Sequence, residues 1–285
     1  MSNYIGKMPS PYTPTEAHCH VRSISLPSRL HPSFYKMEKQ LKRLKTWDSS
    51  DSASSLQTEA ITELYNCMQE LIGCPLTQQA LQHQHHHLEK PLDMSVTLLD
   101  VCGSAREMLF LMKEHMLDLQ SALRRKGVVD SSVNSHIGAY TCFRKKARKD
   151  ISKVLKALKT MESKNSIIKS HSHPFSDVVD HHLQMVIKIL RELSGITISF
   201  FRKVLDFMCE PVFKKNISRG WSSLFSGVVS TGSDRKIDDA KVDVQLVKVR
   251  LGELDGSIRE LEGGLDCLFR CLIQQRVSLL NLITP

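Results

Sequence analysis

Apolar side chains recur every three or four positions over long segments of this 285-residue chain that are otherwise polar. This period matches the turn of an α-helix and predicts helices that each bury one face. The clearest such segment ends at Arg124-Arg125-Lys126-Gly127, where cations and a glycine suit a helix C-terminus. Its predicted buried stripe comprises Leu92, Val96, Leu99, Cys102, Ala105, Leu109, Met112, Met116, Leu119 and Leu123.

The same period predicts helices that begin near residues 33 and 56, that cover about 131–162 and 177–209, and that end the chain with 234–283. Ser194-Gly195 is a candidate kink, and Gly263-Gly264 a candidate break. The string ITISFF (196–201) has strand-like composition, but the helical period continues through it and no partner strand is evident. The predicted fold is therefore all-α: an elongated bundle of five to six long amphipathic helices, with 33–285 as a single domain. The period of the last helix also allows coiled-coil pairing.

The first 32 residues are rich in Pro and Ser and lack the helical period, so we expect a disordered arm. Within it, the run from Arg22 through Ser23 and Ser25 to Pro27 fits the R-S-x-S-x-P pattern of a phosphoserine ligand for 14-3-3 proteins. A phosphate on Ser25 adds negative charge for an arginine cluster, and Pro27 turns the chain out of the binding groove. A pull-down with the phosphorylated arm peptide tests this expected partner.

Lys and Arg outnumber Asp and Glu by 39 to 30, which gives a net charge of +9. Between Tyr140 and Lys164 there are nine basic residues against two acidic ones, so +7 of this excess falls on one predicted helix. The expected basic face comprises Arg144, Lys145, Lys146, Arg148, Lys149, Lys153, Lys156 and Lys159.

Such a face can bind anionic lipid or an acidic protein, or it can simply be the solvated side of a bundle helix. Nucleic acid is the least expected partner, because the only nearby aromatic side chains are Tyr140 and Phe143, at one end. No apolar run approaches the roughly 18 residues of a membrane span. The N-terminus lacks the apolar core of a secretory signal. We therefore expect a cytoplasmic protein, either free or associated with a membrane surface.

The eight cysteines form no CxxC pair, and without a secretory signal we expect them to be reduced. Cys267 and Cys271 lie four residues apart and are predicted to pack in the core. The histidines, including the tract 83–87, lack the paired spacing of a zinc site. Motifs of the GxSxG, P-loop and GxGxxG types are absent. We therefore predict no catalytic residue, cofactor or metal site; an enzyme that uses His and Cys groups is the alternative that metal analysis tests.

Four strings carry a family resemblance: HVRSISLPSRLHPS (20–33), LLDVCGSAREML (98–109), KEHMLDLQSALRRKG (113–127) and QQRVSLLNLIT (274–284). In this order they resemble the plant-specific "domain of unknown function 241" family, which includes the BYPASS proteins. The resemblance covers nearly the whole chain. Two departures are the string LDMSVT (92–97), where the family has a glycine, and the longer His tract.

The resemblance implies an all-helical, non-enzymatic plant protein that takes part in root and shoot development through control of a root-derived mobile signal. It brings no catalytic residue. Cys102 and Gly103, in one of the shared strings, are expected to serve helix packing. Because a glycine inside a helix costs about 1 kcal/mol relative to alanine, we expect a close helix crossing at Gly103. The leading prediction is thus a regulatory or interaction protein, and the alternative is a peripheral membrane protein that docks through residues 140–164.

Overall fold

A computed structural model of the chain describes residues 32–47, 55–125, 131–166, 178–210 and 234–284. Its helices are α1 (Pro32–Trp47), α2 (Ser55–Ile72), α3 (Pro75–His83), α4 (Glu89–Arg125), α5 (Ser131–Ser166), α6 (Val178–Cys209) and α8 (Asp234–Ile283), with a short 3-10 turn at His85–Leu88. The described residues contain no strand. The prediction of an all-α fold is confirmed.

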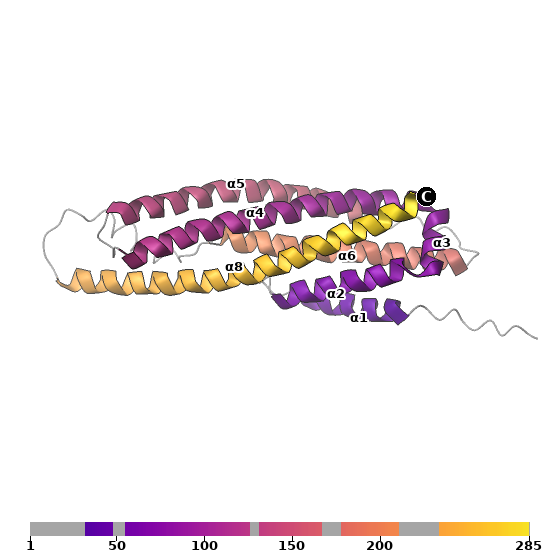
Figure 1. Ribbon diagram of the computed structural model, residues 1–285, viewed down its shortest axis with the longest axis horizontal. Coiled ribbons are helices and arrows are strands. Elements are labelled where there is room, and N and C mark those ends of the chain that lie inside the picture. The colour runs from indigo at the N-terminus through magenta and orange to yellow at the C-terminus, as the bar shows by residue number, and fades with distance from the viewer. Residues whose placement is uncertain (1–31, 48–54, 126–130, 167–177, 211–233, 285) are drawn as a thin grey trace, which may run out of the picture.

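The helices form an elongated bundle (Figure 1). The long helices α4, α5, α6 and α8 run along its length, and α1 and α2 pack at one end, where α3 lies across the tip. The 50 residues of α8 span about 75 Å at the usual rise of an α-helix. α8 runs along the whole bundle and packs against both α4 and α2 (Figure 1).

One connected apolar core runs through the bundle. In α1, the predicted positions Phe34, Met37, Leu41 and Leu44 are all buried. In α4 nearly all of the predicted stripe is buried or half-buried, but Val96 is 40 % exposed. The helices that pack against α4 cover only part of its circumference, and Val96 lies on the side that they leave exposed. Cys271 is buried as predicted, whereas Cys267 is exposed, so the prediction for Cys267 was wrong.

Buried polar side chains in this core contact one another between helices. The hydroxyl of Thr77 on α3 lies 2.8 Å from Nε2 of His182 on α6, and the His182 ring stands edge-on to Phe34. The Tyr65 hydroxyl lies 3.0 Å from the Thr197 hydroxyl and joins α2 to α6. These pairs satisfy groups that would be costly to bury alone. His182 is thus a packing residue that fixes α3 on the tip of α6.

The helices continue through the strand-like string and through the glycine pair. Residues 196–201 lie within α6, where Phe201, Val204 and Leu205 are buried, so the helical prediction is confirmed. The break expected at Gly263-Gly264 does not occur, since α8 is continuous from Asp234 to Ile283. Gly264 instead allows α2 to approach: a Cβ atom there would lie 2.7 Å from Cγ2 of Thr58.

The expected close crossing at Gly103 was wrong. A Cβ atom at Gly103 would meet nothing within 4 Å. The neighbouring Cys102 is the packing residue, because it is fully buried and its thiol lies 3.7 Å from the carbonyl oxygen of Leu265 on α8. Burial raises the pKa of this thiol to about 12, which makes it a small apolar group rather than a reactive one. The glycine needed at a helix contact is Gly264 on α8, the residue before Leu265, where α8 meets α2.

Candidate functional site: the basic ridge of α5

The packing of α5 determines which of its basic residues face solvent. Its buried residues Tyr140, Ala147, Ile151 and Leu158 follow the helical period and face the core between α4 and α6. The opposite side of the helix is exposed and carries a row of cations. We call this row the basic ridge; it comprises Lys145, Lys146, Arg148, Lys149, Lys153, Lys156 and Lys159, all of which are exposed.

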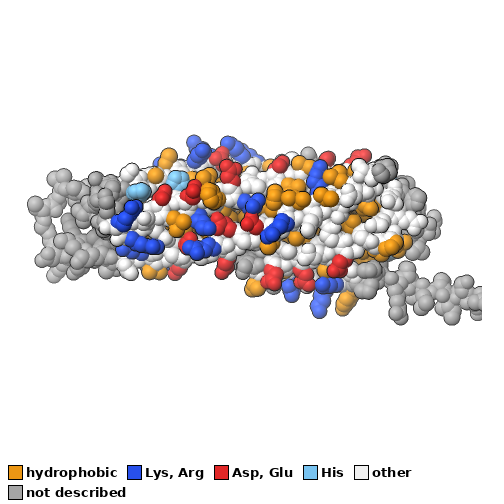
Figure 2. Space-filling view, viewed as in Figure 1, with side chains coloured by type: hydrophobic (Ala, Val, Ile, Leu, Met, Phe, Trp, Pro, Cys, Tyr) orange, Lys and Arg blue, Asp and Glu red, His pale blue; other side chains and the backbone are white. Residues whose placement is uncertain are grey.

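Asp150 is the acid nearest to the ridge, and Lys146 and Lys149 as well as Lys153 act on its charge. Lys153 contacts Asp150 at 2.9 Å, and this hydrogen bond lowers the pKa of the Asp150 carboxyl. Arg148 donates to the carbonyl oxygen of Cys209 at 3.3 Å. The other five ridge lysines form no ion pair with another described residue. Figure 2 shows basic side chains along the upper edge of the bundle, where α5 runs.

Arg144, which the sequence placed on the basic face, lies inside the bundle. It is only 7 % exposed. Its Nη1 donates to the carbonyl oxygen of Met208 at 2.5 Å, its Nη2 donates to that of Glu210, and its guanidinium contacts Sδ of Met112. Burial lowers the pKa of this guanidinium.

The reason for this position is the end of α6. The last carbonyl groups of a helix have no partner within the helix, and a basic side chain can satisfy them. Arg144 does so for Met208 and Glu210, and Arg148 does so for Cys209. A sequence signal for this role exists, because Arg144 falls four residues after Tyr140 and three before Ala147, on the apolar stripe of α5.

The outer side of α4 carries a second charged surface that the sequence analysis missed. Asp93, Asp100, Glu107 and Glu114 recur every seven residues and are all exposed. We call them the acidic row. Three exposed apolar residues run parallel to them, each three positions after an acid: Val96, Phe110 and Leu117. The seven-residue spacing of these acids is the sequence feature that indicates the row. The helical period alone does not show which side of α4 other helices leave uncovered.

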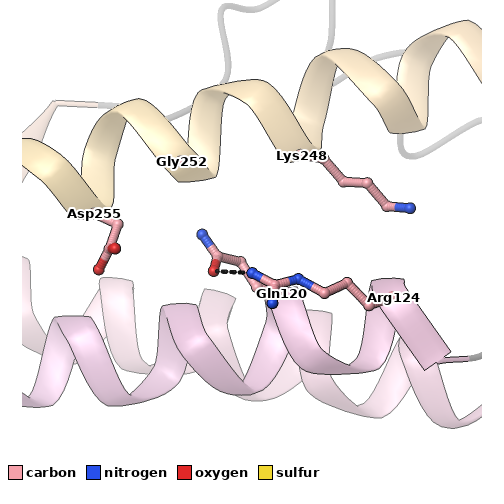
Figure 3. Close-up of a pocket in the computed structure, with 5 residues that line it drawn as sticks. All are labelled: Gln120, Arg124, Lys248, Gly252 and Asp255. Atoms are coloured by element: carbon pink, nitrogen blue, oxygen red, sulfur yellow. Dashed lines mark hydrogen bonds between the residues drawn. The ribbon is translucent and has the colours of Figure 1, made fainter.

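A small polar cavity of about 200 Å³ lies between α4 and α8. Gln120 and Arg124 from α4 face Lys248, Gly252 and Asp255 from α8 (Figure 3). Arg124 donates to the Gln120 side chain at 3.4 Å, and Asp255 pairs with Arg259 at 2.6 Å. Arg259 contacts Oδ2 of Asp255, whereas Oδ1 of Asp255 is buried and has no hydrogen-bond partner among the described residues.

The structure also bears on metal and membrane chemistry. Among the described residues, no group of three or more His, Cys, Asp or Glu side chains is placed to hold a metal ion. Within the same residues, no helix combines the length and the apolar character that crossing a membrane requires.

The family model described as Protein BPS1 matches residues 55–282. The chain belongs to this family. In this BPS1 family protein, the match begins at the start of α2 and ends within the last turn of α8, so the basic ridge and the acidic row both lie in the part shared with the family. The comparisons with curated proteins and with solved structures found no match.

Some predicted site residues of this BPS1 family protein lie outside the described residues. These are Arg22, Ser23, Ser25 and Pro27 of the arm, so the interaction with 14-3-3 proteins stays a prediction. They also lie outside the residues that the family model matches.

Proposed function

We propose that this BPS1 family protein is a non-enzymatic regulatory protein of root and shoot development that acts by binding another macromolecule through the basic ridge. Family membership supports the developmental role, and the resemblance of the four strings supports its assignment to root and shoot. The observation that carries the binding role is the ridge itself: five exposed lysines that form no ion pair with another described residue, on the exposed side of one helix.

An unpaired row of cations favours an acidic partner for a simple physical reason. Like charges that are held side by side repel one another, and an anionic surface relieves that repulsion while it releases counterions. Several cations in one row also steer an acidic partner toward the ridge and orient it. α5 holds the row in place, because its opposite side is fixed in the core by Tyr140, Ile151 and Leu158.

The alternative function is that of a peripheral membrane protein. Its support is the shape of the ridge: the stretch from Lys145 to Lys159 extends about 20 Å along a single helix. α5 lies at the edge of the bundle, where a flat surface can reach it (Figure 1). Each Lys or Arg near an anionic membrane contributes about 1 kcal/mol, so the ridge carries enough charge to dock.

A lysine-to-glutamine variant of the ridge, Lys145→Gln with Lys149→Gln and Lys156→Gln, tests both functions. Loss of three cations should weaken binding to an anionic surface by about 100-fold, from about 1 kcal/mol for each cation. Binding is measured by co-sedimentation with vesicles of neutral lipid and with vesicles that contain anionic lipid, at low and at high salt. The matched control replaces exposed lysines elsewhere: Lys39→Gln, Lys90→Gln and Lys188→Gln.

The outcomes separate the two functions. Binding that requires anionic lipid, disappears at high salt and is lost in the ridge variant alone supports membrane docking. No binding to either kind of vesicle leaves an acidic protein as the partner. If the ridge and control variants bind anionic vesicles equally well, the ridge is not the docking surface.

A further inference from the structure

The acidic row of α4 and the basic ridge of α5 lie on neighbouring helices. The four acids recur every seven residues, close to two helical turns, so they lie on one side of α4. The basic ridge is spaced irregularly and covers the broad exposed side of α5. None of the four acids forms an ion pair with another described residue. Figure 2 shows acidic side chains next to the basic ones in this part of the bundle.

Two acids of the acidic row and two lysines of the basic ridge lie at the same positions along the length of the bundle. α4 and α5 are antiparallel, and Arg144 of α5 contacts Met112 of α4 at 3.5 Å. Glu107 and Lys149 each lie five residues from this contact, and on antiparallel helices they are therefore level. Asp100 and Lys156 each lie twelve residues from it and are level too. The ring contact between His115 and Phe143, at 4.6 Å, supports the same alignment.

Within one molecule these level charges do not meet. Met112 and His115 of α4 meet Arg144 and Phe143 of α5 in the contact between the two helices. The acidic row and the basic ridge lie on the exposed sides of their helices, away from that contact. Each surface thus has its complement on the same chain, at the same height, but outside its reach.

We propose that the protein forms a two-fold dimer in which the acidic row of α4 in each copy pairs with the basic ridge of α5 in the other. In this dimer a two-fold axis runs parallel to the helices and places α4 of one copy opposite α5 of the other. Rotation about such an axis does not change the position of a residue along the bundle. Glu107 then meets Lys149, and Asp100 meets Lys156, each twice by symmetry. The exposed residues Val96, Phe110 and Leu117 lie beside the acidic row, on the side nearer α8, and so at the edge of this contact; Phe110, 55 % exposed, is the largest of them.

This inference rests on the proposed function in that it names a partner, a second copy of the chain, for the same ridge. The charge complementarity within one chain favours a second copy over an unrelated occupant. Because the ion pairs lie at the surface, salt should weaken the dimer. The dimer also covers the ridge, so an external partner and the second copy compete for it.

Charge reversal tests the dimer with a built-in rescue. The first variant, Asp100→Lys with Glu107→Lys, places lysine opposite lysine; the second, Lys149→Glu with Lys156→Glu, places glutamate opposite Glu107 and Asp100. We expect the full-length wild type to sediment as a dimer at low salt, with a Kd at least tenfold higher in 0.5 M salt than in 0.05 M salt. Each variant alone should be monomeric, and an equimolar mixture should restore the dimer, because every contact in the mixed pair again joins opposite charges.

Analytical ultracentrifugation gives the decisive results, with circular dichroism to show that each variant is folded. Wild type that stays monomeric at about 100 μM and low salt overturns the proposal, and so does a mixture that stays monomeric. The first variant leaves the basic ridge intact. If it loses the dimer but still binds anionic vesicles or an acidic protein, both proposals hold; if wild type is monomeric yet the ridge binds such a partner, only the dimer fails.

Discussion

Replacement of Gly264 by leucine should lower the free energy of unfolding by about 3 kcal/mol, the upper range for overpacking in a tight contact. A Cβ atom at this position would lie 2.7 Å from Cγ2, 2.9 Å from Oγ1 and 3.0 Å from Cβ of Thr58. Thr58 is 2 % exposed and has a short, branched side chain that cannot swing away. α2 and α8 must therefore separate, and the core between them opens. Thermal or urea unfolding, followed by circular dichroism, measures the change.

Two other glycines provide the controls for Gly264. Gly263 is its neighbour on α8, and a Cβ atom there meets nothing within 4 Å, so Gly263→Leu should cause little loss. Gly103→Ala should stabilise α4 by up to about 1 kcal/mol through helix propensity alone. Gly264→Ala, a milder change, should also lower the free energy of unfolding, and adding Thr58→Ala to it should restore part of that loss. Equal unfolding midpoints for Gly264→Leu and Gly263→Leu would contradict the close approach of α2 and α8.

Replacement of Arg144 by methionine should cost about 3 kcal/mol of unfolding free energy. Methionine fills much of the space but leaves the buried carbonyl group of Met208 without its donor, whereas water can reach the carbonyl group of the exposed Glu210. An unsatisfied buried polar group costs roughly 1–3 kcal/mol. Arg144→Lys should recover only part of this loss, because an ammonium group lacks the planar fork that reaches both carbonyl oxygens at once.

The matched control for Arg144 is its exposed neighbour. Lys145→Met removes the same charge from the same helix, and its effect should stay within about 0.5 kcal/mol, as for most surface changes. Urea unfolding of the two variants and of wild type gives the comparison. If Arg144→Met is as stable as Lys145→Met, then Arg144 does not hold the end of α6.

The helical period was enough to predict the long helices and most of their buried positions. Each stripe is long, and burial in a bundle depends mainly on which side of a helix is apolar. The same logic extends to Arg144, whose place on the stripe of α5 indicates burial. Arg144 was grouped with the basic face because the residues around it are basic. Its actual position is set by the carbonyl groups at the end of α6, to which it donates hydrogen bonds.

The two glycine positions could not be predicted in the same way. Whether a glycine inside a helix serves a close contact depends on where another helix crosses it, and α2 and α8 are far apart in the sequence. Gly103 and Gly264 look alike in the sequence, yet only Gly264 faces a side chain within 4 Å. The acidic row was missed for a related reason, because the uncovered side of α4 is set by the positions of α5 and α8.

The central claim is that the exposed basic ridge of α5 is the surface through which this BPS1 family protein acts. Proximity labelling in root cells tests it most directly, with wild type compared with the lysine-to-glutamine variants of the ridge and of the control positions. We predict that the ridge variant, although folded and equally abundant, loses the principal neighbours of wild type, whereas the control variant keeps them. The same neighbours around all three proteins would contradict the claim.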